Sequence, residues 1–178
     1  MAIRPDDKDW TWVLTTRCPE CGFDPAAVER TGVGAALRAN VGRWAPLLAH
    51  PAVAVRPRDD RWSALEYGCH VRDVFRRFDQ RLELLLAVDD PTFENWDQDA
   101  TAIADRYGEQ DPVTVSVALV EAGTALADRF DGVPPDAWTR SGSRSDGARF
   151  TVETFATYLL HDPVHHVWDV EEGYRALG

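Results

Sequence analysis

The chain has 178 residues, 44% of them hydrophobic, and its 30 acidic and 19 basic residues give a formal net charge of −11. This length is typical of one domain around one hydrophobic core, so we expect a single domain over residues 1–178. The acidic charge argues against nucleic acid or an anionic membrane surface as the main partner. No apolar run approaches the ~20 residues of a membrane span. Residues 1–9 contain no apolar signal-peptide core, which predicts a cytoplasmic location.

The first segment, residues 1–23, is expected to be an irregular extension that ends in a Cys-x-x-Cys motif formed by Cys18 and Cys21. Three interpretations remain open for this motif: half of a zinc site, a redox pair, or a cysteine-containing turn packed on the rest of the fold. The zinc interpretation needs further ligands, for which Cys69 and a residue such as His50 are the candidates. Cys69 is otherwise expected to be a packed core thiol.

Two helices are predicted in the next part of the chain. Asp24 and Pro25 are typical of an N-cap followed by the first helical position, although Gly32 and Gly34 can interrupt this element. Apolar residues at intervals of three and four then predict a helix to about residue 49. After a loop over residues 51–60, Ser63 begins a capping box, and an apolar stripe extends from it to about residue 87. His70 lies on the same face as this stripe.

The segment over residues 88–110 is a polar crossover that is longer than most connections, which often indicates function or a long bundle crossing. Its aromatic and cationic side chains, with one arginine from a later loop, are candidates to line a substrate pocket: Phe93, Trp96, Arg106, Tyr107 and Arg140. Packing of a long loop explains the same residues equally well.

A third and a fourth helix are predicted in the C-terminal half. Asp111 and Pro112 repeat the N-cap signal, and the apolar stripe that follows ends near Gly132. Residues 138–150 are expected to form a loop, with a short hairpin at Asp146-Gly147. Thr151 then caps the last helix.

The last helix carries the strongest chemical signal. His161 and His165 are four residues apart and continue its apolar stripe, so both imidazoles project from one face. His166 lies about 100° further round the helix and is set aside. Pro163 removes one backbone hydrogen bond, and we expect it to kink the helix rather than to begin a new one.

Four helical patterns with one long crossover predict an all-α four-helix bundle, a fold that builds metal sites from inward-facing side chains. His70, His161 and His165 are therefore the predicted metal ligands, with Asp162 and Asp169 as candidates to orient the imidazoles. Three imidazoles suit a divalent transition metal and leave a coordination position open. Burying them without a metal would require several hydrogen-bond partners.

The order of Trp62-Ser63, His70, the crossover and His161-x-x-x-His165 resembles the DinB/YfiT-like superfamily over residues 30–174. The resemblance implies a DinB-like bundle with a divalent metal, most often zinc or nickel, held by His70, His161 and His165. It also implies kinship to mycothiol-dependent maleylpyruvate isomerase, and hence a low-molecular-weight thiol as cosubstrate. Residues 1–23 lie outside the general pattern of that family.

Two functions follow as hypotheses. The first is a metal-dependent thiol transferase or isomerase that acts on a small-molecule substrate, with the thiol activated at the open metal position. The second is a non-catalytic metal-binding stress or dimerisation protein, which would form a homodimer. The fourth coordination position distinguishes them, because a catalytic site keeps it open and a structural site closes it with a side chain.

Overall fold

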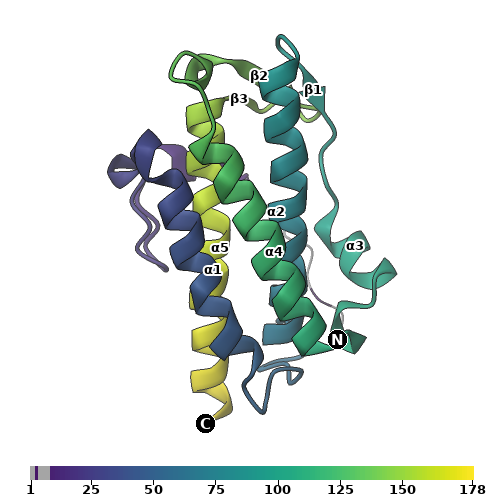
Figure 1. The fold of residues 1–178 in the computed structure, drawn as a ribbon. Helices are drawn as coiled ribbons and strands as arrows, with labels where there is room; N and C mark the ends of the chain where they lie inside the picture. Colours follow the sequence, from purple (N-terminus) through teal and green to yellow (C-terminus); the bar gives the residue numbers. More distant parts are fainter. Residues whose placement is uncertain (1–2, 4–8) are drawn as a thin grey trace.

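The computed structural model describes Ile3 and residues 9–178. Four long helices dominate it: α1 (Val33–Leu48), α2 (Ala64–Ala87), α4 (Pro112–Asp131) and α5 (Val152–Leu177). The shorter elements are α3 (Gln98–Ala104), the strands β1 (Thr92–Phe93), β2 (Ser141–Arg144) and β3 (Arg149–Thr151), and the 3₁₀ turns Trp10–Leu14, Pro25–Ala27, Arg30–Gly32, Tyr107–Glu109 and Ala137–Thr139. The predicted all-α class is confirmed, with one small sheet added at an end of the bundle (Figure 1).

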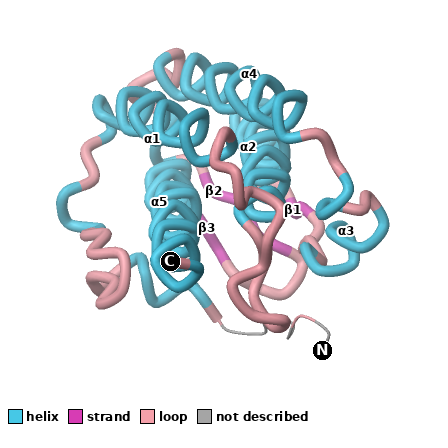
Figure 2. The backbone as a smooth tube through the Cα atoms, turned by 90° about the horizontal axis from the view of Figure 1, so that it is seen from below, coloured by secondary structure: helices cyan, strands magenta, loops and turns pink. Residues whose placement is uncertain are grey.

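The long helices form a ring in the order α1, α4, α2, α5, which is visible down the bundle axis in Figure 2. α2 and α4 are neighbours that run parallel (Figure 1), so the chain must return along the length of the bundle between them. The crossover over residues 88–111 makes this return and carries β1 and α3. At the end where α2 finishes, β1 pairs parallel with β2, and β2 pairs antiparallel with β3.

Most of the helix boundaries follow the predicted capping residues. Ser63 and Glu66 form both bonds of a capping box, and Asp111 accepts a hydrogen bond from the Thr114 amide. Thr151 caps α5 by accepting from the Thr154 amide. The predicted hairpin also forms, with Gly147 at a φ of 96°, a backbone conformation that glycine adopts without strain.

The predicted first helix is wrong in its start. Asp24 does cap the residues that follow it, but the element it begins is a single 3₁₀ turn, Pro25–Ala27. Val28 and Glu29 then take extended backbone angles, so α1 begins only at Val33. The interruption expected near Gly32 therefore separates the turn from the long helix.

α5 is the longest helix and positions most of the chemistry. It continues through Pro163, and Asn40 of α1 donates a side-chain hydrogen bond to the Pro163 carbonyl oxygen. Its buried face joins the hydrophobic core to which all four long helices contribute, among others through Trp44, Phe75, Leu119 and Phe155. None of the helices in the described part of the chain has the length and apolarity to cross a bilayer.

Candidate metal centre

α5 carries two adjacent lines of metal-binding side chains. His161 and His165 form one i,i+4 pair, and Asp162 and His166 form a second pair one residue further along. Because each residue turns the helix by about 100°, the two pairs face different neighbours. The first pair meets the N-terminal segment, whereas the second meets His70 of α2.

The first candidate group consists of His70, Asp162 and His166, whose ligand atoms all lie within 4.8 Å of one another. One carboxylate oxygen of Asp162 is 3.7 Å from His70 Nε2, and the other is 3.7 Å from His166 Nε2. The two imidazole rings stand nearly perpendicular, with centroids 4.8 Å apart. Ligands of a tetrahedral zinc ion with bonds of about 2.0–2.1 Å are about 3.3–3.4 Å apart, so small side-chain shifts complete the geometry.

Hydrogen bonding separates this cluster from an ordinary polar core. Within the described residues, four buried side-chain nitrogen or oxygen atoms have no hydrogen-bond partner: His70 Nδ1, His70 Nε2, His161 Nε2 and Asp162 Oδ1. Buried polar atoms are rarely left unpaired, because each costs about 1–3 kcal/mol. Three of the four belong to the His70–Asp162–His166 group, so these residues fit a metal ion.

The expected protonation states are those of metal ligands. Burial penalises the charged imidazolium and lowers the pKa of His70. Burial also opposes ionisation of Asp162, but the charge of His166 and contact with His70 outweigh it and lower the Asp162 pKa to about 2. A neutral imidazole and an ionised carboxylate are the forms that bind metal.

Asp169 and two tryptophans support the group from outside. Asp169 Oδ2 lies 3.0 Å from His166 Nδ1, while Arg61 donates to its other oxygen at 2.8 Å. The contact of Asp169 with His166 Nδ1 keeps the other ring nitrogen, Nε2, directed toward Asp162. A carboxylate behind a ligating histidine is common around bound metals. The ring of His70 stacks on Trp96 of the crossover at an interplanar angle of 5°, and it also contacts Trp62.

Three neighbouring cavities border α5 between Tyr158 and Asp169. A cavity of about 80 Å³ is lined by Asp162 and His166, together with Tyr158 and residues of the first pair. His166 and Asp169 also line a hollow of about 200 Å³. Trp10 and Gln98 line both of these and a larger cavity of about 900 Å³, whose wall includes the cations Arg144 and Arg149.

The predicted pocket residues are only partly placed as expected. Trp96 lines the largest cavity, but Phe93 and Tyr107 are buried in the core, where the Tyr107 hydroxyl donates to Asp73. Arg140 donates instead to the carbonyls of Leu85 and Val88 at the end of α2, and Arg106 pairs with Glu109 on the surface. None of these four lines one of the three cavities in the described part of the chain.

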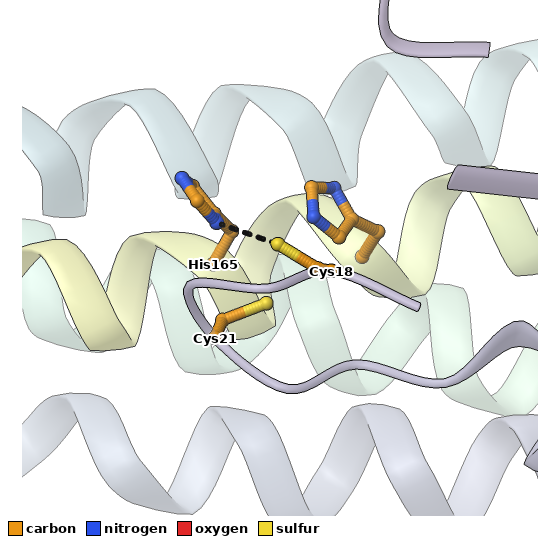
Figure 3. A group of neighbouring side chains, drawn as sticks. Cys18, Cys21 and His165 are labelled. Atoms are coloured by element: carbon orange, nitrogen blue, oxygen red, sulfur yellow. Dashed lines mark hydrogen bonds between the residues drawn. The ribbon is translucent and has the colours of Figure 1, made fainter. Parts of the chain in front are cut away.

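The second candidate group consists of Cys18, Cys21, His161 and His165, again with all ligand atoms within 4.8 Å. Cys18 Sγ lies 3.7 Å from His165 Nδ1 (Figure 3). Burial, followed by the neighbouring His165, lowers the pKa of His161 to about 4. Burial raises the pKa of the Cys21 thiol to about 11.

The predicted ligand set is therefore divided between two groups. His161 and His165 are buried on one face, as expected, but the structure groups them with the two cysteines and not with His70. His70 is met by Asp162, predicted only to orient imidazoles, and by His166, which the periodicity set aside. The sequence signal for the second line was the Asp162-x-x-x-His166 spacing, which is shifted from the histidine pair by one residue.

Comparison with known proteins gives one informative likeness. No protein-family model and no curated protein sequence matches the chain. Among solved structures it is similar to YfiT from Bacillus subtilis, described as a probable metal-dependent hydrolase with an unusual four-helix bundle topology. The two chains are 18% identical with a TM-score of 0.67, over 99% of this chain and 94% of that one. The chain thus has the YfiT-like four-helix-bundle fold that its sequence resembles.

Proposed function

We propose that this protein is a divalent-metal enzyme of the DinB/YfiT type that acts on a small molecule, with the metal held by His70, Asp162 and His166. One observation carries the proposal: three of the four unpaired buried polar atoms in the described residues belong to this single group. The fold shared with YfiT, itself described as a probable metal-dependent hydrolase, supports the same assignment. Two imidazoles and one carboxylate suit zinc or nickel.

The number of ligands favours catalysis over a structural role. No fourth His, Cys, Asp or Glu of the described chain joins the His70 group. Three protein ligands leave a coordination position open, which is the pattern of catalytic zinc sites. The cavities beside Asp162 and His166 provide room for a substrate next to that position.

The protein side chains have distinct roles in this proposal. A divalent ion held here would act as a Lewis acid and lower the pKa of a thiol or water at its open position. Asp162 supplies the negative charge that offsets the ion, and Asp169 fixes the ring of His166. Trp62 and Trp96 cover His70, which is fully buried, and so keep water from that ligand.

We further propose that the activated nucleophile is a low-molecular-weight thiol, used for transfer or isomerisation. The cavity of about 900 Å³ is at the upper end of ordinary ligand pockets and has room for both a thiol cosubstrate and an acceptor. Its wall is strongly polar, because Arg144 and Arg149 are paired with Asp146 and Asp90 and lie near Asp9, Asp97 and Asp99. Water in place of the thiol would give hydrolysis, the activity class named for YfiT.

The test is metal analysis combined with a turnover panel, with and without low-molecular-weight thiols. His70→Ala and His166→Ala should each lose about one divalent ion per chain and all metal-dependent turnover. His50→Ala is the control, because the His50 ring packs at a tilt against Tyr174 and belongs to neither ligand group. Unchanged metal content in both ligand variants would refute the site. Turnover that needs metal but no thiol would replace the transferase by a hydrolase.

A second function, a non-catalytic dimerisation protein, is favoured by one surface feature. Val113, Val117 and Val120 of α4 are exposed and lie at helical spacing, so they form an apolar line on the outside of the bundle. A homodimer through this line predicts that Val117→Glu halves the mass measured by light scattering. Full metal content with no turnover across the panel would favour this function over the enzyme.

A further inference from the structure

The Cys-x-x-Cys loop has a backbone that directs both sulfurs the same way. The Cys18 amide donates to the Phe23 carbonyl at 2.8 Å, and the Gly22 amide donates to the Cys18 carbonyl at 3.0 Å. Gly22 closes the turn at a φ of 75°, in the left-handed region that favours glycine. In Figure 3 the side chains of Cys18 and Cys21 leave this loop on the side of His165.

α5 meets the loop with the other half of a tetrahedral ligand set. His161 and His165 are four residues apart, the spacing with which a helix supplies two imidazoles to a zinc ion. In such a site sulfur and nitrogen ligands are about 3.6 Å apart. The observed distance between Cys18 Sγ and His165 Nδ1 is 3.7 Å. His161 Nε2 is buried without a hydrogen-bond partner, which a zinc bond would supply.

We infer that Cys18, Cys21, His161 and His165 form a second metal site, a structural zinc site that joins the N-terminal segment to α5. Two sulfurs and two imidazole nitrogens are the tetrahedral donor set typical of zinc. Four protein ligands close the coordination shell, so this site is structural whereas the His70 group is open. The inference does not depend on the function proposed above.

Aromatic rings and carboxylates surround the histidines of the site. The rings of Trp10, Trp12 and Phe23 contact the His161 ring, with centroids 5.4, 6.1 and 5.5 Å away. His165 turns its second nitrogen toward carboxylates, with Glu20 at 3.6 Å and Asp169 at 3.8 Å. Acidic groups behind a ligating imidazole increase its basicity toward the metal.

The other ligands considered from the sequence are placed elsewhere. Cys69 Sγ lies 3.7 Å from the Tyr107 carbonyl oxygen within the core, as expected of a packed thiol. His50 Nδ1 accepts a hydrogen bond from the Ala52 amide. The two further ligands that the cysteine pair needs are therefore His161 and His165, near the other end of the chain.

The zinc site has a consequence for the cavities. Trp10 lines all three of them, and it belongs to the segment that the cysteines attach to α5. Zinc would thus hold one wall of these cavities in place. Removing this zinc should change the tryptophan fluorescence of the protein.

The test uses cobalt as a spectroscopic substitute for zinc, because cobalt bound to thiolates gives a charge-transfer band in the near ultraviolet. Full-length protein loaded with cobalt should show the band. The paired substitutions Cys18→Ser and Cys21→Ser should abolish it and remove about one metal ion per chain. His70→Ala should keep the band, and Cys69→Ser is the matched cysteine control. The band reports only on the cysteine site, so its outcome is separable from that of the His70 group.

A measurement on the unchanged protein covers the case in which the double variant does not fold. A thiol reagent should modify Cys18 and Cys21 slowly and release about one zinc ion for the two thiols. Two outcomes would overturn the site: rapid modification with no zinc released, or a Cys18–Cys21 disulfide that persists in a reducing thiol buffer. The second outcome would identify a stable disulfide in place of the zinc site.

Discussion

At the scale of single residues, Asp169 connects the two ligand groups. It pairs with His166 Nδ1 at 3.0 Å and lies 3.8 Å from His165 Nε2. Burial raises its pKa, but the hydrogen bond from His166 and the charges around it more than compensate, so the net shift is downward and the group stays ionised. One buried carboxylate therefore contacts an imidazole of the His70 group and faces an imidazole of the cysteine group.

Substituting Asp169→Asn should weaken metal binding at the His70 group by about 10–100-fold, since His166 loses the carboxylate that orients it. Competition against a chromophoric chelator measures this change. Arg61→Ala is the control, because it removes the ion pair on the other oxygen of Asp169 and leaves the His166 contact. Equal affinities for Asp169→Asn and wild type would show that His166 is oriented without this carboxylate.

At the scale of elements, the bundle depends on close contact where α4 meets α1 and α2. A Cβ atom added at Gly123 would lie 2.3 Å from Val41 Cγ2 and 2.9 Å from the Phe75 ring. Both neighbours are buried, so neither side chain can move aside freely. Gly123 thus permits the helix spacing despite its low helix propensity.

Gly123→Ala should therefore destabilise the protein, because overpacking costs about 1–3 kcal/mol and exceeds the helix-propensity gain of about 1 kcal/mol. Gly42→Ala is the matched control, since nothing lies within 4 Å of a Cβ there. Gly42→Ala should raise the free energy of unfolding by about 0.5–1 kcal/mol. Urea denaturation of both variants gives the comparison, and a stabilised Gly123→Ala would contradict the packing argument.

At the scale of the whole molecule, folding brings histidines from α2 and α5 into the interior in their neutral form. Burial lowers the pKa values of His70, His161 and His165 below the ordinary value of about 6.5 for histidine. Below pH 6.5 the unfolded chain binds protons that the folded chain does not. Stability supplied by these groups is therefore present above pH 6.5 and is lost as the pH falls.

Metal-free protein should lose stability between pH 6.5 and about 4, the pKa of His161, and that residue should contribute at most about 3 kcal/mol of the loss. Melting temperature against pH in the presence of a chelator measures this loss. His161→Gln removes one titrating group and should flatten the curve. Asp162 and Asp169, whose pKa values are lowered, add a loss only below pH 3.8. A flat profile from pH 7 to 4.5 would refute the neutral buried histidines.

The sequence by itself determined the features that depend on near neighbours in the chain. Apolar periodicity gave the four long helices, and the side chains of Ser63, Asp111 and Thr151 gave three of their starts. The histidine-rich stretch of α5 predicts a metal-binding region because i,i+4 spacing places potential ligands on one face. Such signals are local, so they need no knowledge of the fold.

Only the tertiary structure decided which ligands meet. The rotation of α5 about its axis places Asp162 and His166, rather than His161 and His165, against His70, and a one-residue difference in phase changes the facing side by about 100°. Cys18 and His165 are separated by 147 residues, so no pattern along the chain relates them. Helix rotation and long-range contacts depend on the packing of the whole bundle. The sequence therefore predicted candidate metal ligands on α5, and packing divided them into two groups.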